Sequence, residues 1–422
     1  MSNRFHNKFH RHNHHTNSTC PSQFPDSSYD PIASRTSPFQ GEFYSQGAIT
    51  TTETITTYKN LSASCKIIAG AAACASGDYS GVLGGRSNTA SGGYAIIGGG
   101  CLNSASGCCS TIGGGGCNSA PAVAGTVGGG NGNCAGGLAG TVGGGTGNSA
   151  TGTAGFVGGG NANQASGSFS VVGGGSVNTA SAYFAFIGGG TANSASCCGS
   201  TIGGGCCNSI SEIASTIGGG STNTITTSAA TVYCSCATAD YSTIGGGRNN
   251  TATGYSSTIA GGNLNRISAE ASTIGGGYNN TASGLYSTIG GGRCGIASGY
   301  VSVIGGGYNN CATGYASTVG GGSNSLAIGH GSVVVGGVGN ITSSCYSGIL
   351  GGCGNEICST AAGSFIVGSA ITALSSYTTY MNRIELNSSV FHSQSEIVFR
   401  DTGSCRWTVF VTAAGVVSAV PA

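Results

Sequence analysis

The sequence predicts an all-β fold: a parallel β-roll, or β-solenoid, of roughly 20 coils with a 15-residue period and a small C-terminal β cap. Three observations lead to this expectation. Near-copies of Ser-Thr-Ile-Gly-Gly-Gly, found at residues 287–292, recur along most of the chain at a constant spacing. The 83 glycines keep this register instead of the every-third-residue pattern of collagen, and there are only 6 prolines. Short β-branched runs separate the glycines, as expected for strands between turns.

The non-repetitive start, residues 1–60, is interpreted as an anchor. It contains a polar His-rich tail followed by a connector with prolines and aromatic residues. The His tract could bind metal, or it could be a solvated tail that orders on a partner. We expect this segment to act as an anchoring or docking peptide that joins the repeat region to a partner.

The repeat region is assigned to residues 61–370, and each copy is marked by the aliphatic residue before its glycines. The markers are Ile97, Ile112, Val127, Val142, Val157, Val172, Ile187, Ile202, Ile217, Ile244, Ile259, Ile274, Ile289, Ile304 and Val319, with weaker copies at Ile68, Leu83, Val335 and Leu350. Between Ile217 and Ile244 the spacing predicts one unit that is three residues short, with a kink or bulge. The spacing also lengthens near Val335 and after Leu350.

Each unit is expected to form two short strands and two turns. Period-2 alternation directs the aliphatic marker inward, together with small residues of the second strand such as Ala282 and Ala297. The predicted core residues are Ile97, Ile112, Val127, Val142, Ile187, Ile202, Ile217, Ile244, Ile274, Ile289 and Ile304. Equivalent asparagines, from Asn103 to Asn208, are expected to stack into a ladder at the turn.

A core this thin predicts association with other chains. Burying one Ile or Val contributes ~1.5–3 kcal/mol, whereas ordering each backbone residue costs ~1–2 kcal/mol. A second apolar row should therefore be buried between subunits. The candidate oligomer contacts are Tyr94, Phe169, Phe184, Tyr241, Tyr286 and Val301, with Trp407 in the cap.

Residues 371–422 are expected to form the C-terminal β-rich cap or trimerisation domain. Glycine becomes less frequent, and residues 377–386, 395–400 and 406–411 read as ordinary strands. Such a domain could cover the exposed end of the sheet, or it could bind a receptor.

The composition argues against an enzyme and predicts no catalytic residues, cofactor or metal. Only 6% of residues are charged, the net charge is +1, and no charged side chain lies between Arg86 and Glu212. Nucleic-acid binding is not expected without a basic face. A glycan-cutting fibre would need paired carboxylates, for which only Glu212, Asp240, Glu270 and Glu356 are at hand in the later repeats.

The 20 cysteines occupy several positions of the repeat. They could be small buried or half-buried apolar residues, or several could form disulfides after exposure to an oxidising environment. No secretory signal and no membrane-spanning segment is predicted, so we expect synthesis in the cytosol and no membrane insertion.

The pattern Ser-x-Ile-Gly-Gly-Gly-x-x-Asn-Thr-Ala-Ser-Gly-x-Tyr resembles the head repeats of trimeric autotransporter adhesins and of their relatives in fibres of phages and large DNA viruses. Residues 324–332 (Asn-Ser-Leu-Ala-Ile-Gly-His-Gly-Ser) come closest to the adhesin motif. The resemblance covers about residues 65–370 and implies a left-handed parallel β-roll, a homotrimer, and a surface that binds host or matrix molecules. The signal peptide, coiled-coil stalk and membrane barrel of bacterial members are not expected here.

These observations together predict a non-enzymatic structural fibre or surface attachment protein of a virus particle. Its expected partners are two further copies of itself, a virion protein at residues 1–60, and a glycan or protein receptor on the host surface. The expected location is the virion surface, outside the cell. The alternatives are a bacterial-type adhesin head and an ice- or crystal-binding β-solenoid, because a column of outward threonines, such as Thr273 and Thr288, follows the repeat. Phe156, Val171, Phe186 and Val303 interrupt that column.

Overall fold

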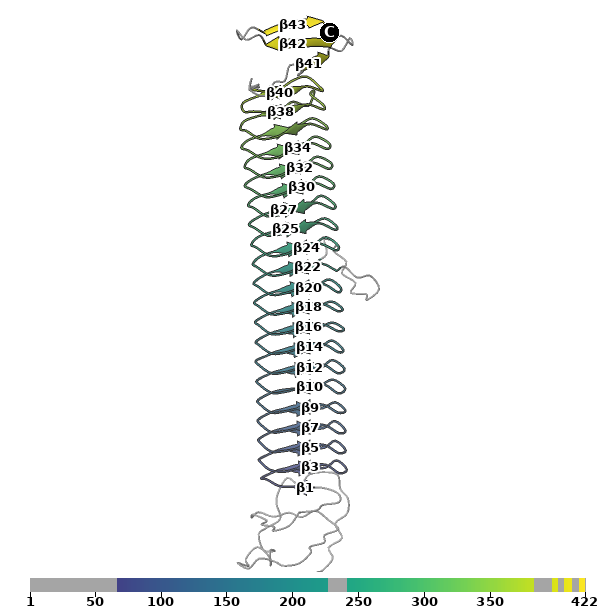
Figure 1. Ribbon diagram of the computed structural model, residues 1–422. Coiled ribbons are helices and arrows are strands. Elements are labelled where there is room, and N and C mark those ends of the chain that lie inside the picture. Colours follow the sequence, from purple (N-terminus) through teal and green to yellow (C-terminus); the bar gives the residue numbers. More distant parts are fainter. Residues whose placement is uncertain (1–66, 227–240, 383–396, 401–405, 412–416, 422) are drawn as a thin grey trace, which may run out of the picture.

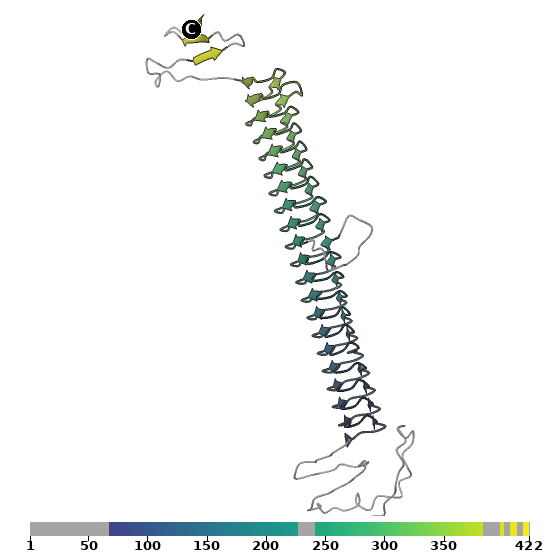
Figure 2. The same ribbon diagram turned by 90° about the vertical axis from the view of Figure 1, so that its right-hand side faces the viewer.

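The computed structural model describes residues 67–226 and 241–382, together with strand segments 397–400, 406–411 and 417–421. Residues 67–226 and 241–382 form an all-β solenoid of about 20 turns, seen as a tall stack in Figure 1 and from its side in Figure 2. We call each turn a coil and name it by its buried aliphatic residue. The predicted fold class is confirmed. The His-rich tail and connector of residues 1–60 lie outside the described residues.

Each complete coil contributes a strand to each of two parallel ladders. The first ladder has 21 strands. They are β1 (Ile67–Ile68), β3 (Gly81–Val82), β5 (Ile96–Ile97), β7 (Thr111–Ile112), β9 (Thr126–Val127), β10 (Thr141–Val142), β12 (Phe156–Val157), β14 (Val171–Val172), β16 (Phe186–Ile187), β18 (Thr201–Ile202), β20 (Thr216–Ile217), β22 (Thr243–Ile244), β24 (Thr258–Ile259), β26 (Thr273–Ile274), β28 (Thr288–Ile289), β30 (Val303–Ile304), β32 (Thr318–Val319), β34 (Val333–Val334), β36 (Gly348–Ile349), β38 (Phe365–Val367) and β40 (Thr379–Met381).

The second ladder lies on the other side of the core, and parallel bridges through Cys134 join its two parts. Its strands are β2 (Cys74–Ala75), β4 (Thr89–Ala90), β6 (Ser104–Ala105), β8 (Ser119–Ala120), β11 (Ser149–Ala150), β13 (Gln164–Ala165), β15 (Thr179–Ala180), β17 (Ser194–Ala195), β19 (Ser209–Ile210), β21 (Thr224–Ile225), β23 (Thr251–Ala252), β25 (Arg266–Ile267), β27 (Thr281–Ala282), β29 (Ile296–Ala297), β31 (Cys311–Ala312), β33 (Leu326–Ala327), β35 (Ile341–Thr342), β37 (Glu356–Ile357) and β39 (Thr372–Ala373).

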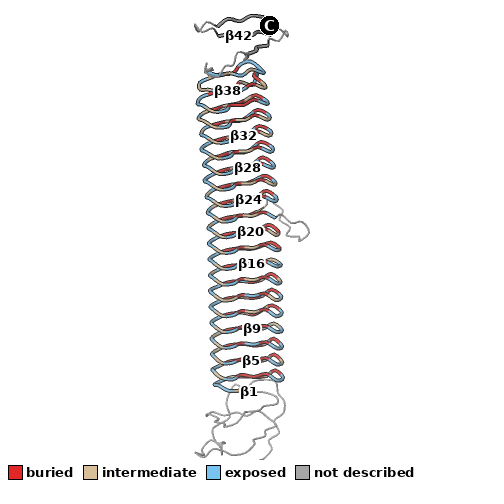
Figure 3. Tube along the Cα trace, in the orientation of Figure 1, coloured by how far each residue is buried: buried red, intermediate tan, exposed pale blue. Residues whose placement is uncertain are grey.

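The core is a column of aliphatic residues facing a column of mostly alanines. Ile289 of β28 stacks on Ile304 of β30, and Ala282 of β27 stacks on Ala297 of β29. All eleven predicted core residues are buried, with at most 1% of the side chain exposed. The buried column is visible as the red inner segments of Figure 3. Period-2 alternation thus places one residue of each two-residue strand inside.

The predicted short unit between Ile217 and Ile244 is wrong. Thr216 pairs directly with Thr243, and Ile217 pairs with Ile244, so these two residues belong to adjacent coils. The stretch between them is a single coil that carries 12 extra residues beyond the usual 15, not two coils of which one is short. The expected kink or bulge falls in residues 227–240, which lie outside the described residues.

Three of the weaker markers were assigned one residue too late. Val82, Val334 and Ile349 are the buried residues of their coils, whereas Leu83, Val335 and Leu350 are exposed. Val319 pairs with Val334 and Val334 with Ile349, so the 15-residue period holds here. The lengthening predicted near Val335 is therefore wrong. The lengthening after Leu350 is confirmed, because Ile349 pairs with Ile366.

The asparagine ladder forms, and it lies inside the solenoid. Asn103 Nδ2 donates to Gly99 O of its own turn and to Gly115 O of the next coil, at 3.0 and 2.9 Å. Its Oδ1 accepts from the backbone N of Asn118 at 2.9 Å. Each buried amide thus satisfies backbone groups that a tight glycine turn would otherwise leave unpaired.

The chain after the solenoid contains a three-stranded antiparallel sheet. β41 (Ile397–Arg400) pairs with β42 (Arg406–Val411), which pairs with β43 (Val417–Pro421). Two of the predicted cap strands therefore exist. The predicted strand 377–386 is represented instead by β40, which pairs with β38 of the solenoid. The side chain of Trp407 lies outside the described part of the structure.

Candidate interaction surface

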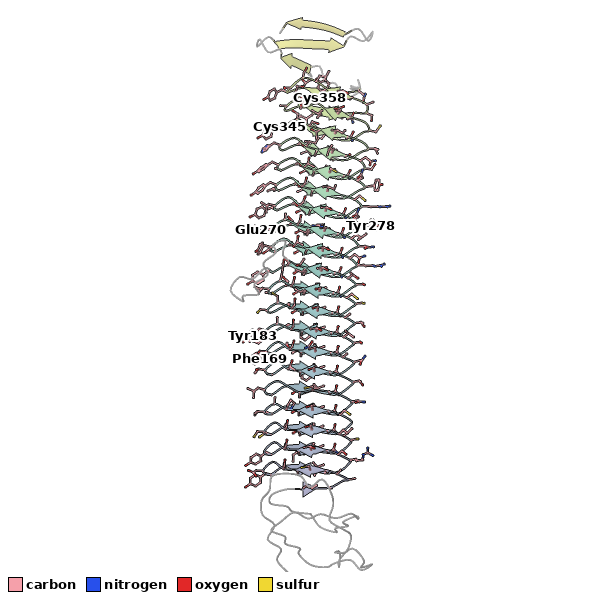
Figure 4. All side chains as sticks on the ribbon, turned by 180° about the vertical axis from the view of Figure 1, so that it is seen from behind. Phe169, Tyr183, Glu270, Tyr278, Cys345 and Cys358 are labelled. Atoms are coloured by element: carbon pink, nitrogen blue, oxygen red, sulfur yellow. The ribbon has the colours of Figure 1, made fainter. Side chains whose placement is uncertain are left out.

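Each coil is flattened, so the solenoid has two sheet faces and two edges. We call the edge formed by the residues three and four places before each buried aliphatic residue the aromatic edge. We call the edge formed by the residues four and five places after it the glycine edge, because it follows the glycine turn. Figure 4 shows Phe169, Tyr183, Glu270 and Cys345 along one side of the rod and Tyr278 on the other.

The aromatic edge carries the predicted oligomer contacts. Tyr94, Phe169, Phe184, Tyr241, Tyr286 and Val301 are all exposed, from 42% for Val301 to 64% for Tyr241. Each has a positive φ, for example 59° at Tyr286. This left-handed residue closes the turn between the two strands, so its side chain is directed away from the core.

The structure adds a second apolar row to this edge that the sequence reasoning missed. In many coils the residue just before the left-handed position is also a large exposed one, and the row includes Val123, Leu138, Tyr183, Tyr255, Leu285, Tyr300 and Tyr315, whereas Cys198 and Ile213 at this position are buried. Strict alternation from the buried aliphatic residue would direct these side chains into the core. The turn breaks the alternation, so this residue and the left-handed residue after it can both face solvent. The signal available in the sequence was the recurrence of large apolar residues at that position.

Aromatic rings of successive coils stack along this edge. Tyr300 and Tyr315 have ring centroids 5.0 Å apart with planes at 10°, and Tyr315 and His330 are 4.8 Å apart at 6°. Tyr286 and Tyr346 extend this row at its two ends through edge contacts of 5.5 and 5.0 Å. Tyr315 is stacked on both of its neighbours, so its faces are poor platforms for stacking a sugar.

The glycine edge carries three arginines of the rod among polar side chains and exposed apolar residues such as Leu102, Val177 and Val338. Arg293 lies between two aromatic rings, with its guanidinium carbon 5.4 Å from the Tyr278 centroid and 5.7 Å from that of Tyr308. These cation–π contacts hold the arginine along the edge. Arg86 and Arg248 occupy the equivalent position of other coils and are exposed.

The charged side chains divide between the edges by sign. Asp78 and Glu270 are exposed on the aromatic edge, and the three arginines lie on the glycine edge. Arg266 and Glu356 occupy outward positions of the second ladder. In the described part of the rod, the carboxylates exposed at the edges thus lie on the aromatic edge and the arginines of the edges on the glycine edge, and both edges expose apolar side chains.

The carboxylates considered for glycan cleavage are not brought together. Glu212 is buried at an inward corner with 3% exposed, Glu270 lies on the aromatic edge, and Glu356 lies on a sheet face. Asp240 lies outside the described residues. Within residues 67–226 and 241–382, no group of three or more His, Cys, Asp or Glu side chains is placed to hold a metal ion.

The longest uninterrupted stretch of the threonine column spans six coils. Thr201, Thr216, Thr243, Thr258, Thr273 and Thr288 occupy six successive coils, because Thr216 pairs directly with Thr243. Their side chains are half-buried on the first sheet face. Val303 ends the stretch on one side and Phe186 on the other.

The described cysteines fall into distinct groups. Cys74, Cys197 and Cys198 are disulfide-bonded. Among the free thiols, Cys134 and Cys311 are half-buried on the second sheet face, and burial raises the pKa of both. The exposed free thiols all lie on the edges: Cys108, Cys109 and Cys345 on the aromatic edge, and Cys117, Cys206, Cys207 and Cys353 on the glycine edge.

Two of these thiol groups are vicinal pairs. The Sγ atoms of Cys108 and Cys109 are 3.6 Å apart, and those of Cys206 and Cys207 are 3.0 Å apart. The hydrogen bond from the neighbouring thiol raises the pKa of Cys109 and that of Cys206.

No protein-family model and no curated protein matches this chain. Among the described residues, there is no helix with the length and apolar character needed to cross a membrane.

Proposed function

We propose that this protein is a non-enzymatic fibre of a virus surface, in which three copies of the solenoid pack side by side to form a shaft. Residues 1–60 would join the shaft to a capsid or other virion protein. The fibre would then present a glycan- or protein-binding surface to the host, outside the cell.

The observation that carries this proposal is the apolar ridge along the aromatic edge. Large side chains such as Tyr94, Phe184 and Tyr255 are more than half exposed on a rod that is otherwise poor in charge. Contiguous exposed apolar surface of this kind marks a protein interface. The ridge follows the solenoid axis, so an equally long partner such as another copy could cover it.

The thin core supports the same conclusion. Each coil buries one Ile or Val and usually one Ala, as in the coil of Ile289, where Ala297 is the second apolar residue. Side-by-side packing would add buried apolar area to every coil at once. Closed rotational symmetry is the usual arrangement for such homo-oligomers.

Sedimentation of the full chain tests the proposal, with an elongated trimer as the expected result. Replacing Tyr94, Phe169 and Phe184 by Ser should weaken the trimer, because it removes apolar area from the interface. The matched control replaces Thr141, Thr201 and Thr216 on the first sheet face by Ser. A monomeric wild-type chain at micromolar concentration would contradict the proposal.

Electron microscopy of particles tests the orientation of the fibre. An antibody against residues 1–60 is expected to label the base of the fibre, near the particle surface. Label at the distal tip would contradict the assignment of residues 1–60 as the anchor.

Ice or crystal binding is a second candidate because six threonines follow one another without a break, from Thr201 to Thr288. Regular hydroxyl and methyl groups at the ~4.8 Å strand spacing are suited to a repeating surface. Thermal hysteresis of the purified protein would support this function, and its absence would exclude ice as the ligand.

A further inference from the structure

Thiols occur on both edges of the same coil at two places in the solenoid. In the coil of Ile349, Cys345 lies on the aromatic edge and Cys353 on the glycine edge. In the coil of Ile112, Cys108 and Cys109 lie on the aromatic edge, and Cys117 on the glycine edge. All five are exposed and free.

Thiols on opposite edges cannot pair within one coil. Cys353 continues the bridge series of Tyr278, Arg293 and Tyr308 through its bridge with Val338, so it lies on the glycine edge. Cys345 lies on the opposite side of the rod (Figure 4). The core separates the two edges, whereas a disulfide requires Cα atoms within about 7 Å.

Oppositely charged side chains also lie on opposite edges of the same coil or of neighbouring coils. In the coil of Val82, Asp78 lies on the aromatic edge and Arg86 on the glycine edge. Glu270 and Arg293 belong to neighbouring coils, those of Ile274 and Ile289. Neighbouring coils are separated by about 4.8 Å, so such charges could meet across an interface with little shift along the rod.

We propose that copies of this chain associate in parallel and in register, with the aromatic edge of one copy against the glycine edge of the next. Disulfides between Cys345 and Cys353, and between the Cys108–Cys109 pair and Cys117, then lock neighbouring copies together. This inference rests on the proposed trimer and specifies which surfaces meet.

Symmetry gives the reason for the register. A rotation axis parallel to the rod brings residues of equal height together and pairs one edge with the other, and three such contacts close a ring. A two-fold axis across the rod would instead pair each edge with itself. That arrangement would place the aromatic edge, with its carboxylates, against another aromatic edge and leave the arginines without partners.

The chemistry requires an oxidant, and a small-molecule disulfide is sufficient. The thiolate of Cys345 attacks oxidised glutathione, forms a mixed disulfide and releases one glutathione thiol. The thiolate of Cys353 in the neighbouring copy then displaces the second glutathione. Two protein thiols and one oxidised glutathione thus yield one interchain disulfide and two reduced glutathiones, which carry away the two thiol protons.

The coil of Ile202 is left out of the test. It has Cys206 and Cys207 on the glycine edge, but Cys198 at its aromatic edge is already disulfide-bonded. Cys134 and Cys311 lie on a sheet face and serve as internal controls, since the edge-to-edge arrangement does not bring them to a neighbour.

The experiment uses the full chain with all free edge cysteines of the described residues except Cys345 and Cys353 replaced by Ser. The replaced residues are Cys101, Cys108, Cys109, Cys117, Cys206, Cys207 and Cys294. After oxidation by glutathione disulfide, we expect covalent trimers on a non-reducing denaturing gel. Adding Cys345→Ser or Cys353→Ser should remove them.

Mixed trimers test the direction of the contact. Chains with Cys345→Ser and chains with Cys353→Ser, assembled together in this background, can form only one disulfide per trimer. They should therefore give covalent dimers and no covalent trimers, and neither chain alone should give any covalent product.

The outcomes separate this inference from the proposed function. Covalent dimers from the Cys353→Ser chain alone would mean that like edges meet, which overturns the inference. A trimer in sedimentation that never forms the Cys345–Cys353 disulfide would also overturn it while leaving the fibre intact. A monomer in sedimentation would overturn both.

Discussion

The Oδ1 atom of Asn103 accepts a hydrogen bond from the backbone N of Asn118, one coil further along, at 2.9 Å. The same contact recurs between successive coils, including across the insertion, where Asn250 N donates to Asn223 Oδ1 at 3.0 Å. The ladder is therefore a hydrogen-bonded column that fixes the register of the glycine turns, and it is interrupted at Gly295 and Ser325. Its interruptions are the places where stability can be changed most directly.

Completing the ladder at Gly295 should stabilise the solenoid. In the Gly295→Asn variant, the new amide would donate to Gly291 O and Gly307 O, and its Oδ1 would accept from Asn310 N, following the contacts of Asn280. Added hydrogen bonds and the lost flexibility of glycine predict a gain of about 1–2 kcal/mol.

Thermal unfolding followed by circular dichroism measures this gain as a rise in Tm. Ser325→Asn is a second test at an equivalent position, where Asn310 Oδ1 already accepts from Ser325 N. A lower Tm for both variants would show that the ladder does not stabilise the turns.

Two adjacent glycines of one turn, Gly291 and Gly292, should differ sharply in their tolerance of a side chain. Gly292 has φ +89°, and a Cβ there would overlap Gly307 O of the next coil, whereas a Cβ on Gly291 meets open space. Gly292→Ala is expected to cost at least about 1–2 kcal/mol from the left-handed conformation alone, with the steric overlap in addition. Gly291→Ala is the matched control, and equal Tm values for the two variants would contradict the expectation.

Replacing the buried Ser302 by alanine is expected to stabilise the fold. The Ser302 hydroxyl is buried without a hydrogen-bond partner, and Ala95 and Ala185 occupy the equivalent place in other coils. Ser302→Ala should raise stability by roughly 1 kcal/mol, because it removes an unpaired buried polar group. In the control Ser170→Ala, loss of the 2.6 Å hydrogen bond from Ser170 Oγ to Gly167 O should lower the stability. Urea unfolding compares the two, and a loss of stability in Ser302→Ala would count against this account.

The half-buried thiols on the sheet face should react only at high pH. Burial raises the pKa of Cys134 and that of Cys311 above the ordinary value of 9.0, so at a given pH less of each is the reactive thiolate. The neutral thiol therefore stabilises the fold below pH 9.0, and this contribution is lost as pH rises through the folded-state pKa.

Iodoacetamide labelling with peptide mass spectrometry over about pH 7 to 10 measures this effect. The midpoint for Cys311 in the folded protein should lie above that of the same peptide in urea. Steric shielding would lower the rate at every pH without moving the midpoint, and coincident midpoints would show that burial does not perturb the thiol.

The sequence predicted the coil well because its period and its inward positions follow from strand alternation and glycine turns. It failed where two interpretations fit the same spacing. Val334 and Val335 are both aliphatic, and only the pairing with Val319 shows which one is inside. The stretch from Ile217 to Ile244 could be two coils or one with an insertion, and only the direct pairing of Thr216 with Thr243 decides.

The candidate surface was harder to predict because turns do not follow alternation. One apolar row was found from Tyr286 and its equivalents, but Tyr300 and Tyr315 were missed because the turn directs two successive side chains outward. Cys345 and Cys353 can be placed in the same coil, on opposite edges, only when the coil and the edge of each residue are known. That assignment comes from the ladder of pairs between coils.

Each coil bonds only to the coil before it and the coil after it, and the 12 extra residues between Ile217 and Ile244 leave that stacking unchanged. Duplication or loss of one 15-residue unit in the gene would therefore lengthen or shorten the rod by one coil, about 4.8 Å. Such a change would move the two ends apart or together without altering either. A lineage could in this way adjust the reach of the molecule without evolving a new fold.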